Sequence, residues 1–297
     1  PAIDGSVALV MHGGCGRREF APFSDVDLMV LVQGSISERL REYFRRLVQD
    51  INDVGLKVGG SLRTPREAST MALRDSQVFS ALTESRFLGG NAELASSITG
   101  LLLRMSQKNY YGVAEGIIAA RGVERTQYGE TVYLLRPNVK RSPGTLRDIH
   151  LIRWLGFVRF GHTALEQLVG HQALTVADAD QLGAANELLL RLRCEMHFAA
   201  GRTQDGLGRN EQVRLAERFG YAGGDGVLPV EELMRDYFRL TSQVRYLADQ
   251  FASATLARQT RTQAILAPLF SRQIDGLFRV GPARIGMEPQ QLPAARG

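Results

Sequence analysis

Apolar residues near the start of the chain fall into two short runs of strand length. Residues 7–11 and 26–32 are apolar and rich in β-branched side chains, and a glycine-rich segment separates them. Such runs, bounded by turn residues, predict two buried neighbouring strands. Between residues 36 and 55 apolar positions recur every three or four residues, which predicts a helix. Residues 56–64 then predict a third short strand.

Helical patterns dominate the remainder of the chain. Pro65 follows Thr64, a suitable N-cap, so a helix is predicted to begin there, and further helices follow to about Arg125. The segment 126–148 is rich in turn residues and predicts an extended connection. Beyond Thr145 the spacing predicts helices over residues 145–160, 163–169, 175–200, 209–219 and 229–266.

These elements predict an α+β fold with two domains, because a single core rarely grows to fill a chain of 297 residues. We expect a small mixed sheet with its helices in residues 1–95. An all-α helical bundle is expected in residues 96–281. Residues 282–297 contain three prolines and no apolar period, so they are predicted to be a linker or a frayed tail.

The composition, 44% apolar and 23% charged, is that of a folded protein. No apolar run approaches the ~18 residues that a membrane helix needs, and the first residues lack a signal-peptide pattern. A cytoplasmic location without membrane contact is therefore expected. Because the chain starts without methionine, we treat it as a candidate fragment of a longer protein.

The formal charge of +5 comes almost wholly from arginine, because Lys57, Lys108 and Lys140 are the only lysines. The arginines are scattered along helical stretches rather than gathered in one basic block, which argues against a nucleic-acid partner. Cys15 and Cys194 lie far apart in the sequence, so neither a disulfide framework nor a zinc cluster is indicated.

Two carboxylates open the second predicted strand. Because side chains alternate along a strand, Asp25 and Asp27 project to the same side of the sheet. Adjacent carboxylates need a cation, and magnesium combines carboxylate oxygens with substrate phosphates, as in two-metal sites for in-line displacement. A pair of this kind alone is more often a solvated turn, whereas the glycine-rich segment before it favours the catalytic interpretation.

The glycines upstream of this pair suit a phosphate-binding turn. Gly13, Gly14 and Gly16 let backbone N–H groups approach a triphosphate without a Cβ atom in the way. Arg17 would neutralise charge on a leaving pyrophosphate. The spacing matches neither the Walker loop nor a dinucleotide fingerprint, so phosphoryl transfer by another architecture is indicated.

Five segments carry a resemblance to a known family. In chain order they are GGCGRREFAPFSDVDLMVL, GLKVGGSLRT, DSQVFSALTESRFLGGN, YGETVYLLRPNVKRSPGTLRDIHLIRWLGFVRFG and MHFAAGRTQDGL. Together they resemble the PII uridylyltransferases and related adenylyltransferases of the DNA polymerase beta nucleotidyltransferase superfamily. The resemblance implies a polymerase beta-like domain followed by the helical domain that packs beside the active site in that family.

The resemblance also implies roles for single residues. Gly13, Gly14 and Ser24 would line the nucleotide phosphates, and Asp25 and Asp27 would bind two magnesium ions, with manganese as an alternative. UTP would be the donor, a tyrosine hydroxyl on the regulatory protein PII would be the acceptor, and pyrophosphate would leave. Coordination to the metal would activate the hydroxyl. The protein would then act in nitrogen regulation.

A polar loop leading into the helix at 145–160 carries Asn138, Lys140, Arg147 and Asp148. If these residues are functional, they contact the triphosphate or the acceptor. The alternative is helix capping together with a surface salt bridge. Lys140 and Arg147 are counted as candidate nucleotide-binding residues, and both interpretations stay open.

Further candidates are weaker. Asp75 and Glu84 are candidates for a third carboxylate, but both fall in helical sequence, so the third metal ligand is unassigned. His12 ends a strand and is a candidate to face the phosphates. The other histidines fall on predicted helices without metal-ligand spacing and are interpreted as structural, namely His150, His162, His171 and His197.

The chain departs from the family's motifs at Cys15, Arg18, Gly60, Arg136 and Thr145. Two alternatives to uridylyl transfer therefore stay open. One is a nucleotidyltransferase with another base or acceptor, such as AMP transfer to a protein or small molecule, or modification of an RNA end. The other is a catalytically silent module that binds nucleotide or PII. The choice of base depends on a few hydrogen bonds at the base edge, which the sequence does not decide.

Overall fold

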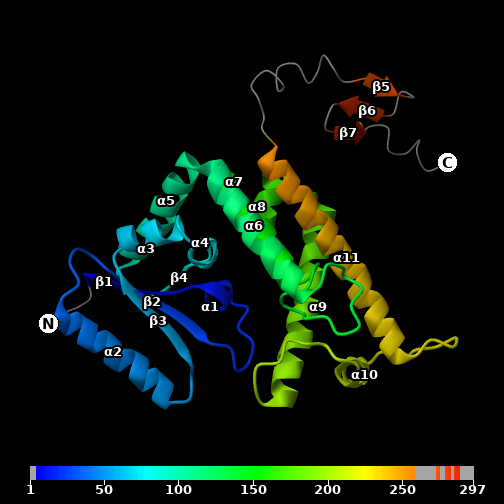
Figure 1. The fold of residues 1–297 in the computed structure, drawn as a ribbon, viewed down its shortest axis with the longest axis horizontal. Helices are drawn as coiled ribbons and strands as arrows, with labels where there is room; N and C mark the ends of the chain where they lie inside the picture. Colours follow the sequence, from blue (N-terminus) through cyan, green and yellow to red (C-terminus); the bar gives the residue numbers. More distant parts are fainter. Residues whose placement is uncertain (1–4, 258–271, 275–277, 282–283, 288–297) are drawn as a thin grey trace. The chain divides into compact units, whose positions relative to one another are not determined.

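The computed structural model describes residues 5–257, 272–274, 278–281 and 284–287, and the chain divides into two compact units, Pro1–Leu256 and Ala257–Gly297 (Figure 1). In the second unit, β5 (Arg272–Ile274), β6 (Phe278–Gly281) and β7 (Arg284–Met287) form an antiparallel sheet in that order.

A four-stranded mixed sheet forms the first part of the larger unit. Its strands are β1 (Val7–Met11), β2 (Val26–Val32), β3 (Val58–Arg63) and β4 (Arg86–Gly90), in the order β3-β2-β1-β4. Strand β1 pairs antiparallel with β2 and β4, whereas β2 and β3 are parallel. The three strands predicted from the sequence are confirmed. Strand β4 was missed because RFLGG contains neither a β-branched run nor a clear alternation of apolar and polar residues.

Both faces of the sheet are covered, as the alternation of its side chains requires. Val7, Val30 and Val32 pack on one face against the apolar side of α2 (Glu38–Asp53). Residues on the opposite face of the sheet belong to the large hydrophobic core, which they share with helices later in the chain. Figure 1 shows α2 on one side of the sheet and α3, α4 and α5 on the other.

Nine helices follow the third strand in the described part of the larger unit. They are α3 (Pro65–Ala72), α4 (Ser76–Thr83), α5 (Ala92–Lys108), α6 (Tyr110–Tyr128), α7 (Leu146–Phe160), α8 (Leu165–Gly170), α9 (Val176–Ala200), α10 (Arg209–Arg218) and α11 (Pro229–Leu256). The predicted start at Pro65 is confirmed, since Thr64 and Glu67 form a capping box. The predicted α+β class, a small mixed sheet followed by a helical bundle, is also confirmed.

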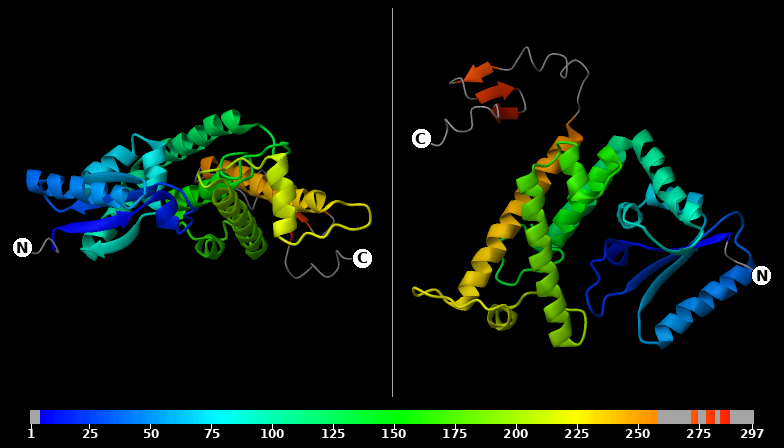
Figure 2. Two further views of the ribbon diagram at one scale, coloured as in Figure 1. Left: turned by 90° about the horizontal axis from the view of Figure 1, so that it is seen from below. Right: turned by 180° about the vertical axis from the view of Figure 1, so that it is seen from behind.

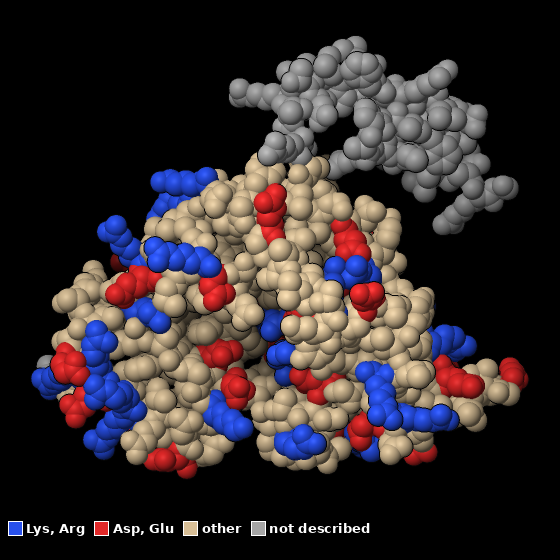
Figure 3. Space-filling view, in the orientation of Figure 1, with Lys and Arg blue, Asp and Glu red and all other residues tan. Residues whose placement is uncertain are grey.

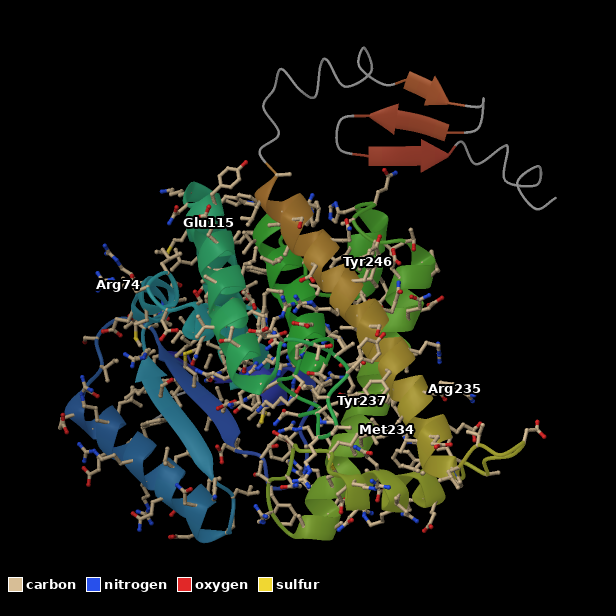
Figure 4. All side chains as sticks on the ribbon, turned by 45° about the vertical axis from the view of Figure 1, so that its right-hand side comes forward. Arg74, Glu115, Met234, Arg235, Tyr237 and Tyr246 are labelled. Carbon is tan, nitrogen blue, oxygen red and sulfur yellow. The ribbon has the colours of Figure 1, made fainter. Side chains whose placement is uncertain are left out.

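Helix α7 is the centre of the bundle. It packs against α6, α9 and α11, and most of its side chains are buried. Helices α7, α9 and α11 lie side by side in both views of the molecule (Figures 1 and 2). On α11 the helical period directs Tyr237 into the bundle and Arg235 toward solvent (Figure 4).

One hydrophobic core continues from the sheet into the bundle. It joins Ala8 and Met29 of the strands to Leu155 of α7 and Phe251 of α11. The predicted domain division between residues 95 and 96 falls inside α5 and stays a prediction.

The C-terminal region differs from the sequence prediction. We expected only helices beyond Thr145, but β5, β6 and β7 are strands of three or four residues, too short to produce a recognisable period. Helix α11 ends at Leu256, and residues 258–266 of the predicted helix lie outside the described residues. The predicted tail, residues 282–297, contains β7, and its other residues also lie outside.

Among the residues that the structure describes, no helix combines the length and the apolar character needed to cross a membrane.

Gly144 provides a test of how the loop before α7 packs on α11. Its φ is +74°, and a Cβ atom there would overlap the backbone carbonyl group of Thr241. We expect Gly144→Ala to lower the free energy of unfolding by about 2–5 kcal/mol, from the left-handed backbone and the overlap together.

Gly183→Ala is the matched control, because Gly183 is exposed within α9 and a Cβ atom would meet no atom within 4 Å. That change should raise stability by about 0.5–1 kcal/mol. Urea unfolding followed by circular dichroism measures both variants, and equal midpoints would contradict a rigid contact at Gly144.

Candidate active site

A cavity of about 520 Å³ lies between the β1–β2 connection and residues of α4, α6, α7 and α9. Figure 3 shows the molecule hollowed between the sheet region and the helices, with acidic and basic side chains around the hollow. The predicted site residues that line the cavity are Gly13, Gly14, Arg17, Ser24, Asp25, Asp27, Lys140 and Arg147. Gly16 is the one predicted residue outside this lining.

Asp25 and Asp27 face the cavity together, as strand alternation predicted. Asp25 immediately precedes β2 and Asp27 is its second residue. Burial raises the pKa of the Asp27 carboxyl, the neighbouring His12 opposes this shift, and repulsion from Asp25 adds to it. Burial also lowers the pKa of His12, against the attraction of Asp27. The charged form of the Asp27 carboxyl is therefore disfavoured in the metal-free protein.

Two glycines leave room around the oxygens of Asp27. Gly13 has φ +58°, and a Cβ atom there would lie 2.7 Å from Oδ2 of Asp27. A Cβ atom on Gly59 of the neighbouring strand would lie 3.4 Å from Oδ1. The space that these glycines leave beside the carboxylate is a cradle that a larger residue would fill.

The donor set fits magnesium. Across the part of the chain that the structure describes, no group of three or more His, Cys, Asp or Glu side chains could hold a metal ion. Magnesium does not require such a cage, because it commonly uses one or two carboxylates and completes its shell with substrate phosphates and water. Asp25 and Asp27 supply that kind of ligand at the wall of an open cavity.

The glycine-rich segment is a short helix, α1 (Gly13–Arg17), and not the turn that we predicted. Gly13 and Gly14, at its first turn, line the cavity. Gly16 lies on the other side, where a Cβ atom would overlap the backbone carbonyl of Glu84. This glycine therefore allows close packing of α1 on the end of α4.

Arg17 lines the cavity but is engaged with two carboxylates. Its Nε donates to Glu19 at 2.8 Å, and its guanidinium also pairs with Glu84. These partners hold the pKa of Arg17 above its ordinary value although burial opposes this. Glu84, fully buried, has a raised pKa because of burial, which Arg17 opposes. The geometry thus gives Arg17 a structural function besides the predicted pyrophosphate contact.

Glu19 joins this segment to α7. One oxygen accepts a hydrogen bond from Arg153 at 2.8 Å, and the other lies 2.6 Å from Nε2 of His150. Burial alone would raise the pKa of Glu19, but His150, Arg153 and Arg17 hold it well below its usual range. We name Arg17, Glu19, His150 and Arg153 the Glu19 cluster. The sequence analysis identified His150 as structural but had no signal for its partner.

Lys140 and Arg147 form the basic side of the cavity. Burial lowers the pKa of Lys140 to about 8, and repulsion from Arg193 and Arg147 adds to this shift. Burial also lowers the pKa of Arg147. Arg141 and Arg193 line the same cavity and were not predicted. Arg141 and Arg147 pair with Glu124, and Arg193 pairs with Asp205. These four cations nevertheless outnumber the two carboxylates, and the remaining positive charge favours an anionic ligand.

The other two polar residues of this loop have structural roles. Asn138 accepts hydrogen bonds from the backbone N–H groups of Lys140 and Arg141 at 3.0 and 2.8 Å. The buried carboxylate of Asp148 accepts from Arg121 at 2.7 Å and from Arg125 at 2.8 Å. Asn138 therefore stabilises a turn of the loop and caps no helix, because the N-cap of α7 is Thr145. The ion pairs of Asp148 are buried, in contrast to the surface salt bridge of the sequence-based alternative.

Neither candidate for a third carboxylate lines the cavity. Asp75 is the N-cap of α4 and accepts from the backbone of Gln77 at 2.7 Å, and Glu84 pairs with Arg17. Instead, α4 and α6 contribute polar side chains that the sequence analysis missed, among them Gln77 and Glu124. The helical period predicted both helices. It does not show which face of a helix lines a cavity, because the other walls of the cavity come from distant parts of the sequence.

Three departures from the family's motifs have local structural consequences. Arg18 has φ +63°, so a position at which the family often has glycine is left-handed here, at a cost of roughly 1–2 kcal/mol. Gly60 lies against Val48 and Phe44 of α2, and a larger side chain would displace them. Thr145 is buried and donates to the carbonyl of Ser142 at 2.6 Å.

Comparison with known proteins identifies relatives. Residues 115–252 match the family described as GlnD PII-uridylyltransferase. A bifunctional uridylyltransferase/uridylyl-removing enzyme of Ectopseudomonas mendocina is 35% identical over 249 residues, 83% of this chain and 27% of the relative. Enzymes of the same name from Pseudomonas aeruginosa and Stutzerimonas stutzeri are 34% and 35% identical over 83% and 82% of this chain. The chain spans about a quarter of their length, at 27% in each case.

The pKa of Lys140 can be tested by competitive labelling with acetic anhydride and mass spectrometry. Only a neutral amine reacts, so with a pKa of about 8 the reactivity of Lys140 should rise through that pH and be about half-maximal there. Inorganic triphosphate should move this midpoint to higher pH, because an anion favours the charged amine. Lys57 and Lys108 lie outside the cavity lining and control for the reagent. A midpoint unchanged by triphosphate would contradict phosphate binding at Lys140.

Proposed function

The chain belongs to the PII-uridylyltransferase family, and we propose that it catalyses transfer of UMP from UTP to a tyrosine hydroxyl of a PII-type protein, with release of pyrophosphate. The observation that carries this proposal is one cavity in which Asp25 and Asp27 lie together with Lys140 and Arg147. Paired carboxylates for a metal and cations for a triphosphate are the two requirements of metal-dependent nucleotidyl transfer.

Asp25 and Asp27 would hold magnesium, with manganese as a substitute. The bound metal would supply charge neutralisation on the phosphates and lower the pKa of the attacking hydroxyl. The raised pKa of Asp27, caused by burial and by Asp25, is consistent with a site that gains stability when a cation neutralises it.

The cations of the cavity would bind the triphosphate. Lys140 and Arg147, which line the cavity, would neutralise charge that develops on the leaving pyrophosphate. Gly13, Gly14 and Ser24 would contribute backbone N–H groups and a hydroxyl. Because the pKa of Lys140 is about 8, the charged fraction of its amine falls as the pH rises through that value. Its contribution to nucleotide affinity should therefore decline above that pH.

The direct test incubates the protein with magnesium, a PII protein from the same source and each labelled NTP in turn, and reads transfer by mass spectrometry. UMP on a PII tyrosine is the expected product. Because charge stabilisation by the metal is worth several kcal/mol, Asp25→Asn with Asp27→Asn should reduce transfer at least about 1000-fold. The variant should stay folded, since replacing both carboxylates removes their mutual repulsion and the burial of a charge at Asp27 in the metal-free protein.

Asp50→Asn with Asp53→Asn is the matched control, because both residues are exposed on α2. Its activity should equal that of the wild type. Full transfer by the folded Asp25/Asp27 variant would overturn the metal assignment. Transfer of AMP instead of UMP would identify ATP as the donor. Tight nucleotide binding without transfer would identify a catalytically silent module.

A further inference from the structure

The three residues before Asp25 are held by the helical region. The carbonyl oxygen of Pro22 contacts Nδ1 of His197, which must carry the proton because a carbonyl only accepts. Thr203 donates its hydroxyl to the carbonyl of Phe23 at 2.9 Å. Arg193 donates to the hydroxyl of Ser24 at 3.3 Å. Every residue from 22 to 24 is therefore bound by a residue of α9 or of the loop that follows it.

Asp205 organises two of these donors. Its Oδ1 accepts from Nε of Arg193 at 2.8 Å and lies 2.9 Å from Nε2 of His197. Burial would raise the pKa of Asp205, but Arg193, His197 and Lys140 hold it below its ordinary value. His197 is fully buried and Arg193 nearly so. The carboxylate thus fixes the orientation of both side chains while they bind residues 22 and 24.

The backbone of Asp205 reaches the basic side of the cavity. Its carbonyl accepts from the N–H of Val139 at 2.9 Å, and Asn138 and Gly206 form an antiparallel bridge. Lys140 is the next residue in this segment. Asp205 itself does not line the cavity. One residue therefore connects the segment that carries Asp25 to the segment that carries Lys140.

Residues 22–24 have little else to determine their conformation. Phe23 has φ +60° and a side chain that is 52% exposed, so neither backbone preference nor burial holds it. The N–H of Ser24 bonds within the loop, to the carbonyl of Ala21 at 3.1 Å. Contacts from the helical region thus set where this loop delivers Asp25.

We propose that Asp205, together with Arg193, His197 and Thr203, forms a set of positioning residues, the Asp205 cluster, that places the Asp25 carboxylate relative to Asp27 and Lys140. This inference rests on the proposed function, because it assigns the cluster to the same metal and triphosphate site. Outer partners of this kind orient metal-binding carboxylates without touching the metal.

The experiment compares Asp205→Asn with Asp236→Asn in the full chain. Asp236 is the control because its carboxylate pairs with Arg239 at 3.5 Å on α11, and Asp236 does not line the cavity. Three quantities are measured: Mn²⁺ affinity by electron paramagnetic resonance with uridine 5′-(α,β-imido)triphosphate, amide exchange of residues 18–27 without metal, and the kcat and KM of transfer.

Asp205→Asn should weaken Mn²⁺ binding and lower kcat by about 10- to 100-fold, the usual effect of losing an outer partner. Amide exchange of residues 23–25 should accelerate by at least the same factor. The KM for UTP should change less than about 3-fold, because Arg147 and the glycines of α1 are retained. A loss of global stability alone would also lower the apparent kcat, but it would accelerate amide exchange throughout the chain rather than at residues 23–25.

Thr203 supplies a second pair of variants in case Asp205→Asn does not fold. Thr203→Val keeps the shape and removes the donor to Phe23, so it should lower kcat about 2- to 10-fold, the value of one hydrogen bond. Thr203→Ser keeps the donor and should restore activity. Equal kcat and equal exchange in the two Thr203 variants would overturn the proposal.

The outcomes separate the two hypotheses. If the wild type binds no Mn²⁺, and Asp25→Asn with Asp27→Asn changes nothing, the proposed function has failed. If the wild type binds Mn²⁺ but Asp205→Asn matches Asp236→Asn in affinity and exchange, the positioning role has failed. If Mn²⁺ binding and exchange respond as expected but no nucleotide is transferred, the cluster positions the metal carboxylates and the proposed reaction is wrong.

Discussion

The buried carboxylate of Glu19 is the contact on which the arrangement of the candidate site depends. It lies in the connection between β1 and β2, ahead of Asp25 and Asp27, and its partners Arg17, His150 and Arg153 come from α1 and α7. A buried carboxylate is stable in its charged form only when it is paired. Removing one partner of a buried ion pair typically lowers the free energy of unfolding by about 3–5 kcal/mol. This requirement holds the β1–β2 connection against the central helix of the bundle.

The charges of the cavity divide into two kinds. Arg17, Glu19 and Glu84 neutralise one another and stabilise the wall. Asp27 and Lys140 are not neutralised in this way, so burial raises the pKa of the first and lowers that of the second. A cation at the carboxylates and a polyanion at the lysine would each remove an unfavourable charge. The ion pairs, and not the direction of the pKa shift, separate the two kinds of charge, because burial raises the pKa of Glu84 as well.

Much of the fold could be predicted because its signals are local. Strand alternation and helical period are properties of neighbouring residues, and they located β1, β2, β3 and the helices of the bundle. The side-by-side placement of Asp25 and Asp27 follows from the same alternation. The misses have physical reasons. Strand β4 is a short edge strand rich in glycine, and α1 is a single turn whose glycines suggest a loop.

The sequence by itself determined β1, β2, β3 and most of the helices, the carboxylate pair, and the resemblance to a nucleotidyltransferase family. Only the tertiary structure decided which charges meet. Glu19 lies 131 residues from His150 and 134 from Arg153, and Pro22 lies 175 from His197. Contacts over such separations have no period or spacing in the sequence, because they depend on how the bundle packs beside the sheet. The same packing brings Arg193 of α9 into the cavity.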